Sequence, residues 1–141
     1  MVLRVLSQIW KSGAEIYRDK TDNRLALKNA NKVPTEVLKA AEPIFPDIEK
    51  WFASWEQAPA VDITIMKTLH LFCGWQGNPK ISEWLNNDLE SLDMLDRWCK
   101  ALSNNGWKDI YDDFRQYENE ESNKLKQALY DRAMAYFKKG A

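Results

Sequence analysis

The sequence has few of the residues on which catalytic and metal-binding proteins depend, with one histidine and two cysteines among 141 residues. His70 and Cys73 are three residues apart, a spacing that puts both side chains on one face of a helix, and Cys99 is the other thiol. A structural zinc site takes four such ligands, and no fourth is evident. We therefore expect neither a metal nor a cofactor, and we interpret these three side chains as parts of the core.

The sequence motifs of common enzyme classes are missing as well. No phosphate-binding glycine loop, dinucleotide glycine motif, metalloprotease motif or EF-hand loop occurs. A nucleophilic cysteine needs a base within hydrogen-bonding reach, and His70 could serve Cys73 in this way, but neither residue lies in a glycine-rich nucleophile turn. We expect no catalytic residues and no enzymatic activity.

Long apolar runs are also absent. No stretch of about 18 apolar residues occurs, and a shorter one does not span the hydrocarbon core as a helix. The N-terminal segment 1–6 is apolar, but Arg4 interrupts it and no small-residue cleavage site follows, so it does not resemble a signal peptide. We expect a cytoplasmic protein with reduced cysteines and no membrane partner.

Glycine and proline are scarce, at five residues each, and they mark the ends of segments, while 45 % hydrophobic residues suffice for a core. Apolar residues recur at helical spacing from Val2 to Ile9, and Gly13 can end that helix in a left-handed conformation. Two strand-like runs follow, at 15–18 and 24–27, separated by Asp and Asn residues that tolerate turn geometry. This pattern predicts a helix followed by a β-hairpin.

The prolines divide the next part of the chain. Pro34 suits the first turn of a helix, because its ring fixes φ and its missing N–H is not needed there. Pro43 and Pro46 predict a break, followed by a helix that carries an apolar face as far as Trp55. The proline-bearing segment 57–60 is the predicted linker. The first part of the chain therefore has the order α-β-β-α-α.

The rest of the chain is predicted to be helical. Four segments show helical periodicity: residues 62–73, a segment that begins at Ser82 or Asn87 and carries the leucines from 85 to 102, residues 107–117, and residues 125–137. The predicted fold class is α+β and mostly α, with an α-β-β-α-α unit at 1–57 and a bundle-like helical region at 61–141, tethered to it or packed with it as one domain. The leucine stripe fits an intramolecular interface or a homodimer equally well.

Charge is almost balanced overall, with 20 Lys and Arg against 21 Asp and Glu, but it is unevenly spread. Residues 1–39 hold eight basic and four acidic residues, and residues 83–121 hold four basic and eleven acidic ones. A basic hairpin attracts an acidic peptide or phosphates, whereas an acidic face mimics nucleic acid or meets a basic partner. The acidic candidates are Asp112, Asp113, Glu118, Glu120 and Glu121.

Seven tryptophans exceed what a small core usually needs, and aromatic side chains are favoured at binding hot spots. Periodicity assigns Trp10, Trp51 and Trp98 to the core. Trp75 and Trp84 lie near the loop at Gly77, and we consider them alternative surface anchors.

One part of the sequence resembles a known family. The segments 13–17 (GAEIY), 23–27 (NRLAL), 33–38 (VPTEVL) and 48–52 (IEKWF) follow a first helix in an order similar to that of TubC-type N-terminal docking domains, over residues 1 to about 55. That family occurs at the starts of hybrid peptide and polyketide synthase subunits, and similar domains occur in small free-standing phage and plasmid proteins. The resemblance implies an α-β-β-α-α fold whose exposed hairpin docks an acidic peptide, with contact residues Arg18, Lys20, Arg24 and Lys28.

These observations favour a non-catalytic docking or adaptor protein, as in a phage or other mobile element. It would bind an acidic peptide or protein surface through the basic hairpin, with Tyr17 adding apolar contact after charge-steered encounter. The first alternative is a phage-encoded, anti-CRISPR-like inhibitor of a host nucleic-acid-handling or defence machine, acting through the acidic helical half. The second is a nucleic-acid-binding accessory protein, which the near-zero net charge does not favour.

Overall fold

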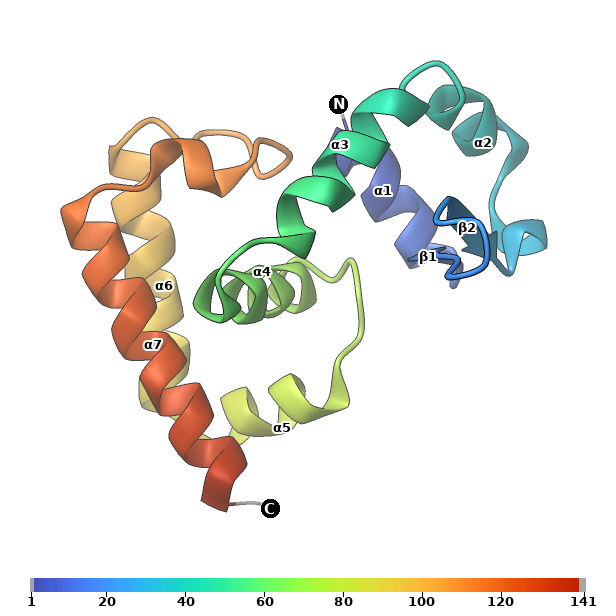
Figure 1. Ribbon diagram of the computed structural model, residues 1–141. Coiled ribbons are helices and arrows are strands. Elements are labelled where there is room, and N and C mark those ends of the chain that lie inside the picture. The colour runs from blue at the N-terminus through green and yellow to red at the C-terminus, as the bar shows by residue number, and fades with distance from the viewer. Residues whose placement is uncertain (1, 140–141) are drawn as a thin grey trace. The chain divides into compact units, whose positions relative to one another are not determined.

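The computed structural model describes residues 2–139, with only the backbone of Lys139, and the chain divides into two compact units. The hairpin unit comprises residues 1–58 and 74–76, and the helical unit comprises residues 59–73 and 77–141. Helices dominate both units, and a two-stranded antiparallel sheet lies in the first, so the predicted α+β, mostly α class is confirmed. Figure 1 shows the elements.

The hairpin unit begins with α1 (Val2–Lys11), which is strongly amphipathic. Its buried face includes Val5 and Ile9, which pack with Ala14 and Val33 in one apolar cluster. Gly13 ends the helix with φ +92°, a left-handed conformation that glycine adopts without the clash a Cβ would cause. The predicted first helix and its glycine stop are confirmed.

The hairpin pairs β1 (Glu15–Arg18) with β2 (Leu25–Lys28), as the sequence predicted. A short 3-10 turn, η1 (Ala30–Lys32), leads to α2 (Thr35–Ala41), which follows Pro34. The chain breaks at Pro43, and α3 (Phe45–Glu56) carries Pro46 in its first turn, where no intrahelical N–H is required. Both α2 and α3 pack against α1, so the order α-β-β-α-α is confirmed.

The helical unit contains four α-helices among its described residues: α4 (Ala60–Phe72), α5 (Pro79–Asn87), α6 (Leu89–Asn104) and α7 (Glu120–Lys139). Gly74, at φ +77°, follows the end of α4. The long helices α6 and α7 run side by side, and α4 and α5 pack against α7 (Figure 1). Leu95, Trp98, Leu102 and Leu129, which are fully buried, come from this pair of long helices.

The predicted segment from Leu85 to Leu102 is two helices rather than one. Asp88 ends α5 and also caps α6, with φ −139° and ψ 82°, well outside helical values. Its carboxylate accepts hydrogen bonds from the Ser91 backbone N–H and from the Ser91 hydroxyl, whose Oγ lies 2.6 Å away. The leucine spacing continues across Asp88, but the backbone breaks because this side chain satisfies the first amides of a new helix.

The helix predicted at 107–117 is wrong, because this segment is irregular up to a 3-10 turn, η2 (Phe114–Tyr117). Asp109 and Asp113 accept hydrogen bonds from the backbone N–H groups two residues on, at 2.9 Å each. Such local bonds compete with helical ones. The Trp107 indole donates to the Asp112 carbonyl at 3.1 Å and holds the loop in its irregular course.

Within residues 2–139, no helix is long and apolar enough to cross a membrane.

Candidate docking surface on the hairpin unit

The register of the hairpin assigns each side chain to one of two faces. Ile16 pairs with Leu27 and Arg18 with Leu25, so these four side chains share the inner face, toward the apolar cluster that includes Ile16 and Leu27. Tyr17 pairs with Ala26 and Glu15 with Lys28 on the outer face. The hairpin therefore divides the predicted contact residues, since Arg18 lies on the face opposite Tyr17 and Lys28.

Arg18 is engaged inside its own unit. Its guanidinium contacts Glu56 and Glu49 of α3, with Nε 2.5 Å from Glu56 Oε1 and Nη1 3.6 Å from Glu49 Oε2. It also donates to the Asn23 carbonyl at 3.0 Å. The charge of Arg18 is thus offset by two carboxylates, and its position ties the hairpin to α3.

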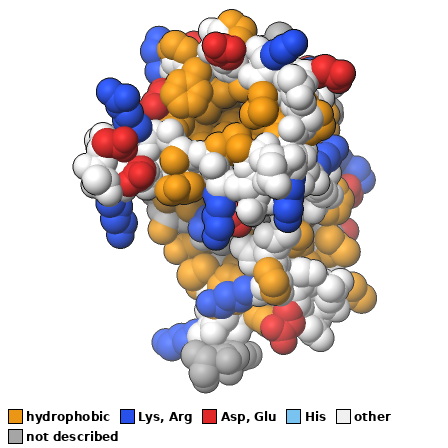
Figure 2. All heavy atoms as spheres, turned by 90° about the vertical axis from the view of Figure 1, so that its right-hand side faces the viewer, with side chains coloured by type: hydrophobic (Ala, Val, Ile, Leu, Met, Phe, Trp, Pro, Cys, Tyr) orange, Lys and Arg blue, Asp and Glu red, His pale blue; other side chains and the backbone are white. Residues whose placement is uncertain are grey.

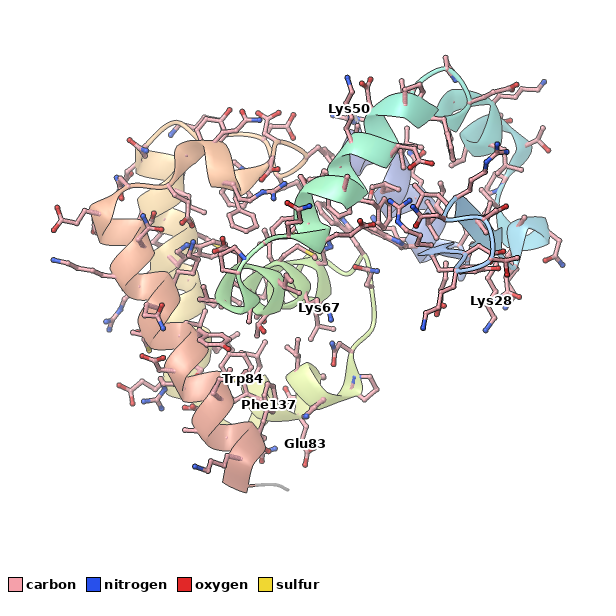
Figure 3. All side chains as sticks on the ribbon, viewed as in Figure 1. Lys28, Lys50, Lys67, Glu83, Trp84 and Phe137 are labelled. Atoms are coloured by element: carbon pink, nitrogen blue, oxygen red, sulfur yellow. The ribbon has the colours of Figure 1, made fainter. Side chains whose placement is uncertain are left out.

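The other predicted basic residues are exposed to solvent. Lys20 lies in the turn, Arg24 directly before β2, and Lys28 at the end of β2. Figure 3 labels Lys28, whose side chain extends away from the strand pair. Tyr17, on the outer face, is 46 % exposed. These four exposed residues belong to the hairpin and its turn, where Glu15 lies opposite Lys28 and Asp19 lies opposite Arg24.

The sheet has two strands, so the outer edge of each pairs with no further strand. Asp19 donates its N–H to the Arg24 carbonyl at 2.8 Å, which fixes the 19–24 pair as hydrogen-bonded. Hydrogen-bonded and non-hydrogen-bonded pairs alternate in an antiparallel ladder, so the N–H and C=O groups of Leu25 and Leu27 point away from β1. Within residues 2–139 these two N–H groups have no backbone acceptor. The backbone of β2 therefore presents unpaired donors and acceptors.

An apolar pocket of about 200 Å³ lies beside this edge. Three consecutive residues of β2 line it, but only Ile16 comes from β1. The opposite wall comes from the end of α2 and from α3, where Leu38 and Phe45 are 37 % and 42 % exposed. The lining residues are Ile9, Ile16, Leu25, Ala26, Leu27, Leu38, Ala41, Glu42, Phe45 and Ile48. Figure 2, which views the hairpin side, shows a hollow walled by hydrophobic side chains with charged side chains around it.

The pocket residues were not singled out from the sequence as a site. Leu38 and Phe45 have the spacing of helix core positions, and only their observed exposure distinguishes them from core residues. Pro43 was the available signal, because the break there makes α2 and α3 separate helices, and apolar residues of both line the pocket.

The predicted acidic surface is smaller than expected. The Glu118 side chain is 9 % exposed and accepts from the Trp98 indole at 3.2 Å and from Lys126 Nζ at 2.5 Å. Asp113 is bound by Arg115 at 2.5 Å. Asp112, Glu120 and Glu121 remain exposed. Glu118 thus belongs to the interior of the helical unit, because a buried lysine and an indole N–H need its carboxylate.

Lys126 lies between Glu118 and Asp62, with Nζ 2.6 Å from Asp62 Oδ1. Burial is the largest single influence on its pKa and lowers it, but the hydrogen bonds to Asp62 and Glu118 and the charges of these carboxylates together outweigh burial, so the pKa is raised. Lys126 therefore stays charged and joins α4 to α7.

The prediction of surface tryptophan anchors is wrong, because Trp75 is 2 % exposed and Trp84 is completely buried. Trp84 packs edge-on against Phe137 of α7, with ring centroids 5.9 Å apart (Figure 3). Trp84 follows the helical periodicity of α5, which places its indole between helices.

His70 is buried, while Cys73 and Cys99 are half-buried free thiols. Burial, with smaller contributions from Cys73 and Asp96, raises the pKa of the Cys99 thiol to about 12. A thiol with this pKa is a poor nucleophile at neutral pH. Among the described residues, no group of three or more His, Cys, Asp and Glu side chains is arranged to hold a metal ion.

Comparison with protein-family models finds no match to this sequence, and comparisons with curated proteins and with solved structures find none either.

Proposed function

We propose that this chain is a non-catalytic docking protein that binds an extended, acidic segment of a partner protein along the open edge of β2. The observation that carries the proposal is the unpaired backbone of Leu25 and Leu27 beside an apolar pocket. An added strand satisfies these donors and acceptors, and its alternate side chains reach the pocket. Arg24 and Lys28 flank the edge and favour acidic residues in the docked segment.

Charge also argues against a second copy of the chain as the occupant. If two β2 strands paired antiparallel about Ala26, Arg24 of one copy would lie opposite Lys28 of the other. Like charges directly opposite one another destabilise a strand pair. Lysine on an open edge is a common way to prevent such self-association. An acidic segment meets the same two residues favourably.

The alternative functions gain less support. Of the five acidic candidates, only Asp112, Glu120 and Glu121 are left for an inhibitor acting through an acidic face, since Glu118 and Asp113 are engaged internally. Direct nucleic-acid binding would rely on a few exposed cations, and its affinity would fall steeply with salt. Neither alternative uses the apolar pocket or the unpaired β2 edge.

The test uses the full chain and a fluorescent eight-residue peptide that alternates aspartate with leucine and valine. We expect saturable binding by anisotropy at physiological salt, with amide shifts at Leu25 and Leu27 in NMR spectra. Arg24→Glu/Lys28→Glu should weaken binding about tenfold or more, because two favourable charge contacts become repulsive. The matched control is Lys67→Glu/Lys108→Glu, which reverses two exposed lysines of the helical unit.

Backbone methylation of the peptide distinguishes strand addition from charge attraction. One version carries N-methyl groups on the odd-numbered residues and the other on the even-numbered residues. Alternate N–H groups of a strand point to opposite edges, so one version loses its hydrogen bonds to β2 and the other keeps them. We expect one version to lose binding and the other to retain it. Equal affinity of both versions would contradict strand addition. Tighter binding of a single-stranded oligonucleotide, lost at higher salt, would support the nucleic-acid alternative instead.

A further inference from the structure

Glu42 differs chemically from the other residues of the apolar pocket. Of its ten lining residues, nine are aliphatic or aromatic, and Glu42 is the exception. It directly follows α2, where its N–H bonds to the Leu38 carbonyl and its side chain is exposed. Among residues 2–139, Glu42 takes part in none of the ion pairs described and is not among the residues with a further interaction. A negative charge without a partner therefore stands at the α2 wall of an apolar pocket.

The volume of the pocket limits its occupant to one side chain. A cavity of roughly 150 Å³ accommodates a benzene ring, and drug-sized ligands need about 300 Å³ or more. The pocket, at about 200 Å³, holds one aromatic or large aliphatic group. A group that fills it removes water from the neighbouring carboxylate, which then costs free energy unless a donor or cation replaces that water.

We propose that the pocket binds one bulky apolar group that carries a positive charge at its outer end, and that Glu42 pairs with that charge. This inference rests in part on the proposed function, because the natural occupant is then a side chain of the docked segment. The segment would be acidic where it passes Arg24 and Lys28, and basic beside the residue that enters the pocket. Glu42 would weaken, without abolishing, the binding of segments that are acidic throughout, since an anion at this position would face a carboxylate.

Charge on the two walls thus selects the pattern of charges along the docked segment. The β2 wall has Arg24 and Lys28 at its ends, while the α2 wall has Glu42. A peptide with its acidic and basic parts exchanged would place like charges together on both walls. The order of charges along the partner, and not only their number, then decides whether it binds.

The first experiment tests the pocket without any peptide. The full chain is titrated with 3-phenylpropan-1-amine and with 3-phenylpropanoate, which differ in the sign of charge on the same apolar group, and amide shifts at Ile9, Leu38 and Phe45 are followed. We expect the amine to bind about fivefold or more tightly than the acid, a difference in the range of an exposed ion pair together with the removal of repulsion. Equal affinities would overturn the proposal.

Two variants and a control assign the preference to Glu42. Glu42→Gln should abolish the difference between amine and acid, and Glu42→Lys should reverse it. Glu36→Lys is the matched control, because Glu36 is an exposed carboxylate in the first turn of α2 and does not line the pocket. A preference for the amine that persists in Glu42→Gln would also overturn the proposal.

A second experiment separates this inference from the docking function. The alternating acidic peptide is compared with a version in which one aspartate beside the central leucine is replaced by lysine. We expect the lysine version to bind the wild-type protein more tightly than the original acidic peptide does. With Glu42→Lys the order should reverse, so that the lysine version binds more weakly than the acidic peptide. If the amine binds the pocket but neither peptide docks, the docking function is wrong and the pocket inference stands. If both peptides dock equally and Glu42→Lys changes neither affinity, the pocket inference is wrong and docking stands.

Discussion

The Arg18 guanidinium of β1 lies 2.5 Å from the carboxylate of Glu56, the last residue of α3. Glu49, two helical turns earlier, contacts the same guanidinium. A two-stranded hairpin alone is marginally stable in water, and packing on a helix is the usual remedy. Arg18 therefore holds the proposed docking edge in position instead of acting as a free cation for a partner.

Replacing Arg18 with methionine should increase local opening of the hairpin and lower the overall stability of the protein only slightly. The ion pairs are partly exposed, so we expect a loss of about 1 kcal/mol in the free energy of unfolding. The hydrogen-bonded amides of Tyr17 and Ala26 should exchange with solvent faster, which hydrogen exchange followed by NMR would detect. The control is Lys20→Met, which alters an exposed turn residue. Unchanged protection of both amides in Arg18→Met would contradict this role.

Replacing Lys126 with methionine should destabilise the helical unit strongly. The substitution leaves Glu118 and Asp62 without their shared cation, and Glu118 is 9 % exposed. Breaking a buried pair by removing one partner typically costs about 3–5 kcal/mol. Urea denaturation followed by far-ultraviolet circular dichroism would measure this loss.

The control for that experiment is Lys124→Met on the same helix. Lys124 pairs with Glu120, and both side chains are largely exposed. We expect a change below about 0.5 kcal/mol. Equal effects of the two substitutions would mean that the Lys126 site is not tightly enclosed in solution.

Acid should weaken the junction between α5 and α6. The hydrogen bond from Arg132 is the largest cause that lowers the pKa of Asp88, to about 2 from its ordinary 3.8, and the bonds from Ser91 contribute. Because the pKa of Asp88 is lower in the folded state than in the unfolded state, the ionised carboxylate stabilises the fold. This stabilisation is complete above pH 4 and is lost as the pH falls from about 4 to 2. After a discount for solvent screening we expect on the order of 1 kcal/mol.

Asp88→Asn tests this expectation. The amide still accepts the capping hydrogen bond but has no charge to titrate. Its stability should therefore change less than that of the wild type between pH 4 and pH 2, as measured by thermal unfolding across that range. Parallel curves for the two proteins would show that Asp88 does not contribute to acid sensitivity.

Cys99 should react slowly with iodoacetamide in the native protein. Burial raises the pKa of its thiol to about 12 from an ordinary 9.0, which reduces the thiolate population at pH 8 about a thousandfold. Cys73→Ser isolates Cys99, and mass spectrometry follows its labelling. Labelling should become fast in denaturant, and a native rate equal to the denatured rate would contradict the burial of this thiol.

The sequence predicted the hairpin unit well because its signals are local. Gly13 marks the end of α1, the Asp and Asn residues of segment 19–23 mark the turn, and Pro34 precedes α2. Each acts through the conformation of its own backbone or of the next few residues. Such signals do not depend on which parts of the chain meet in the folded state.

The failures arise where a side chain acts over a longer range. The sequence pattern predicted Glu118 on an exposed acidic face, but its carboxylate is largely buried and binds Lys126 and the Trp98 indole. The aromatic spacing of segment 107–117 resembles a helix, yet Asp109 and Asp113 form local bonds that a helix excludes. No periodicity carries this information, because the partners are decided by packing.

The apolar pocket of the candidate site could not be predicted from the sequence either. Its walls combine α1, the hairpin, α2 and α3, so no continuous stretch of sequence contains it. The basic hairpin residues could be named from composition alone. Glu42 could not, since an acidic residue after a helix is ordinary until an apolar cavity is known to lie beside it.

Asp88 ends one helix and begins the next without an intervening loop, and this has a consequence for how the chain tolerates changes in length. A residue inserted into α5 or at the start of α6 would rotate the following side chains by about 100° around the helix axis, with no flexible segment to absorb the turn. Leu95 would then leave the interior, and so would Trp84 where the insertion precedes it. Insertions and deletions should therefore be excluded between residues 79 and 104, and the irregular segment 105–113 is where natural variants of different length would differ.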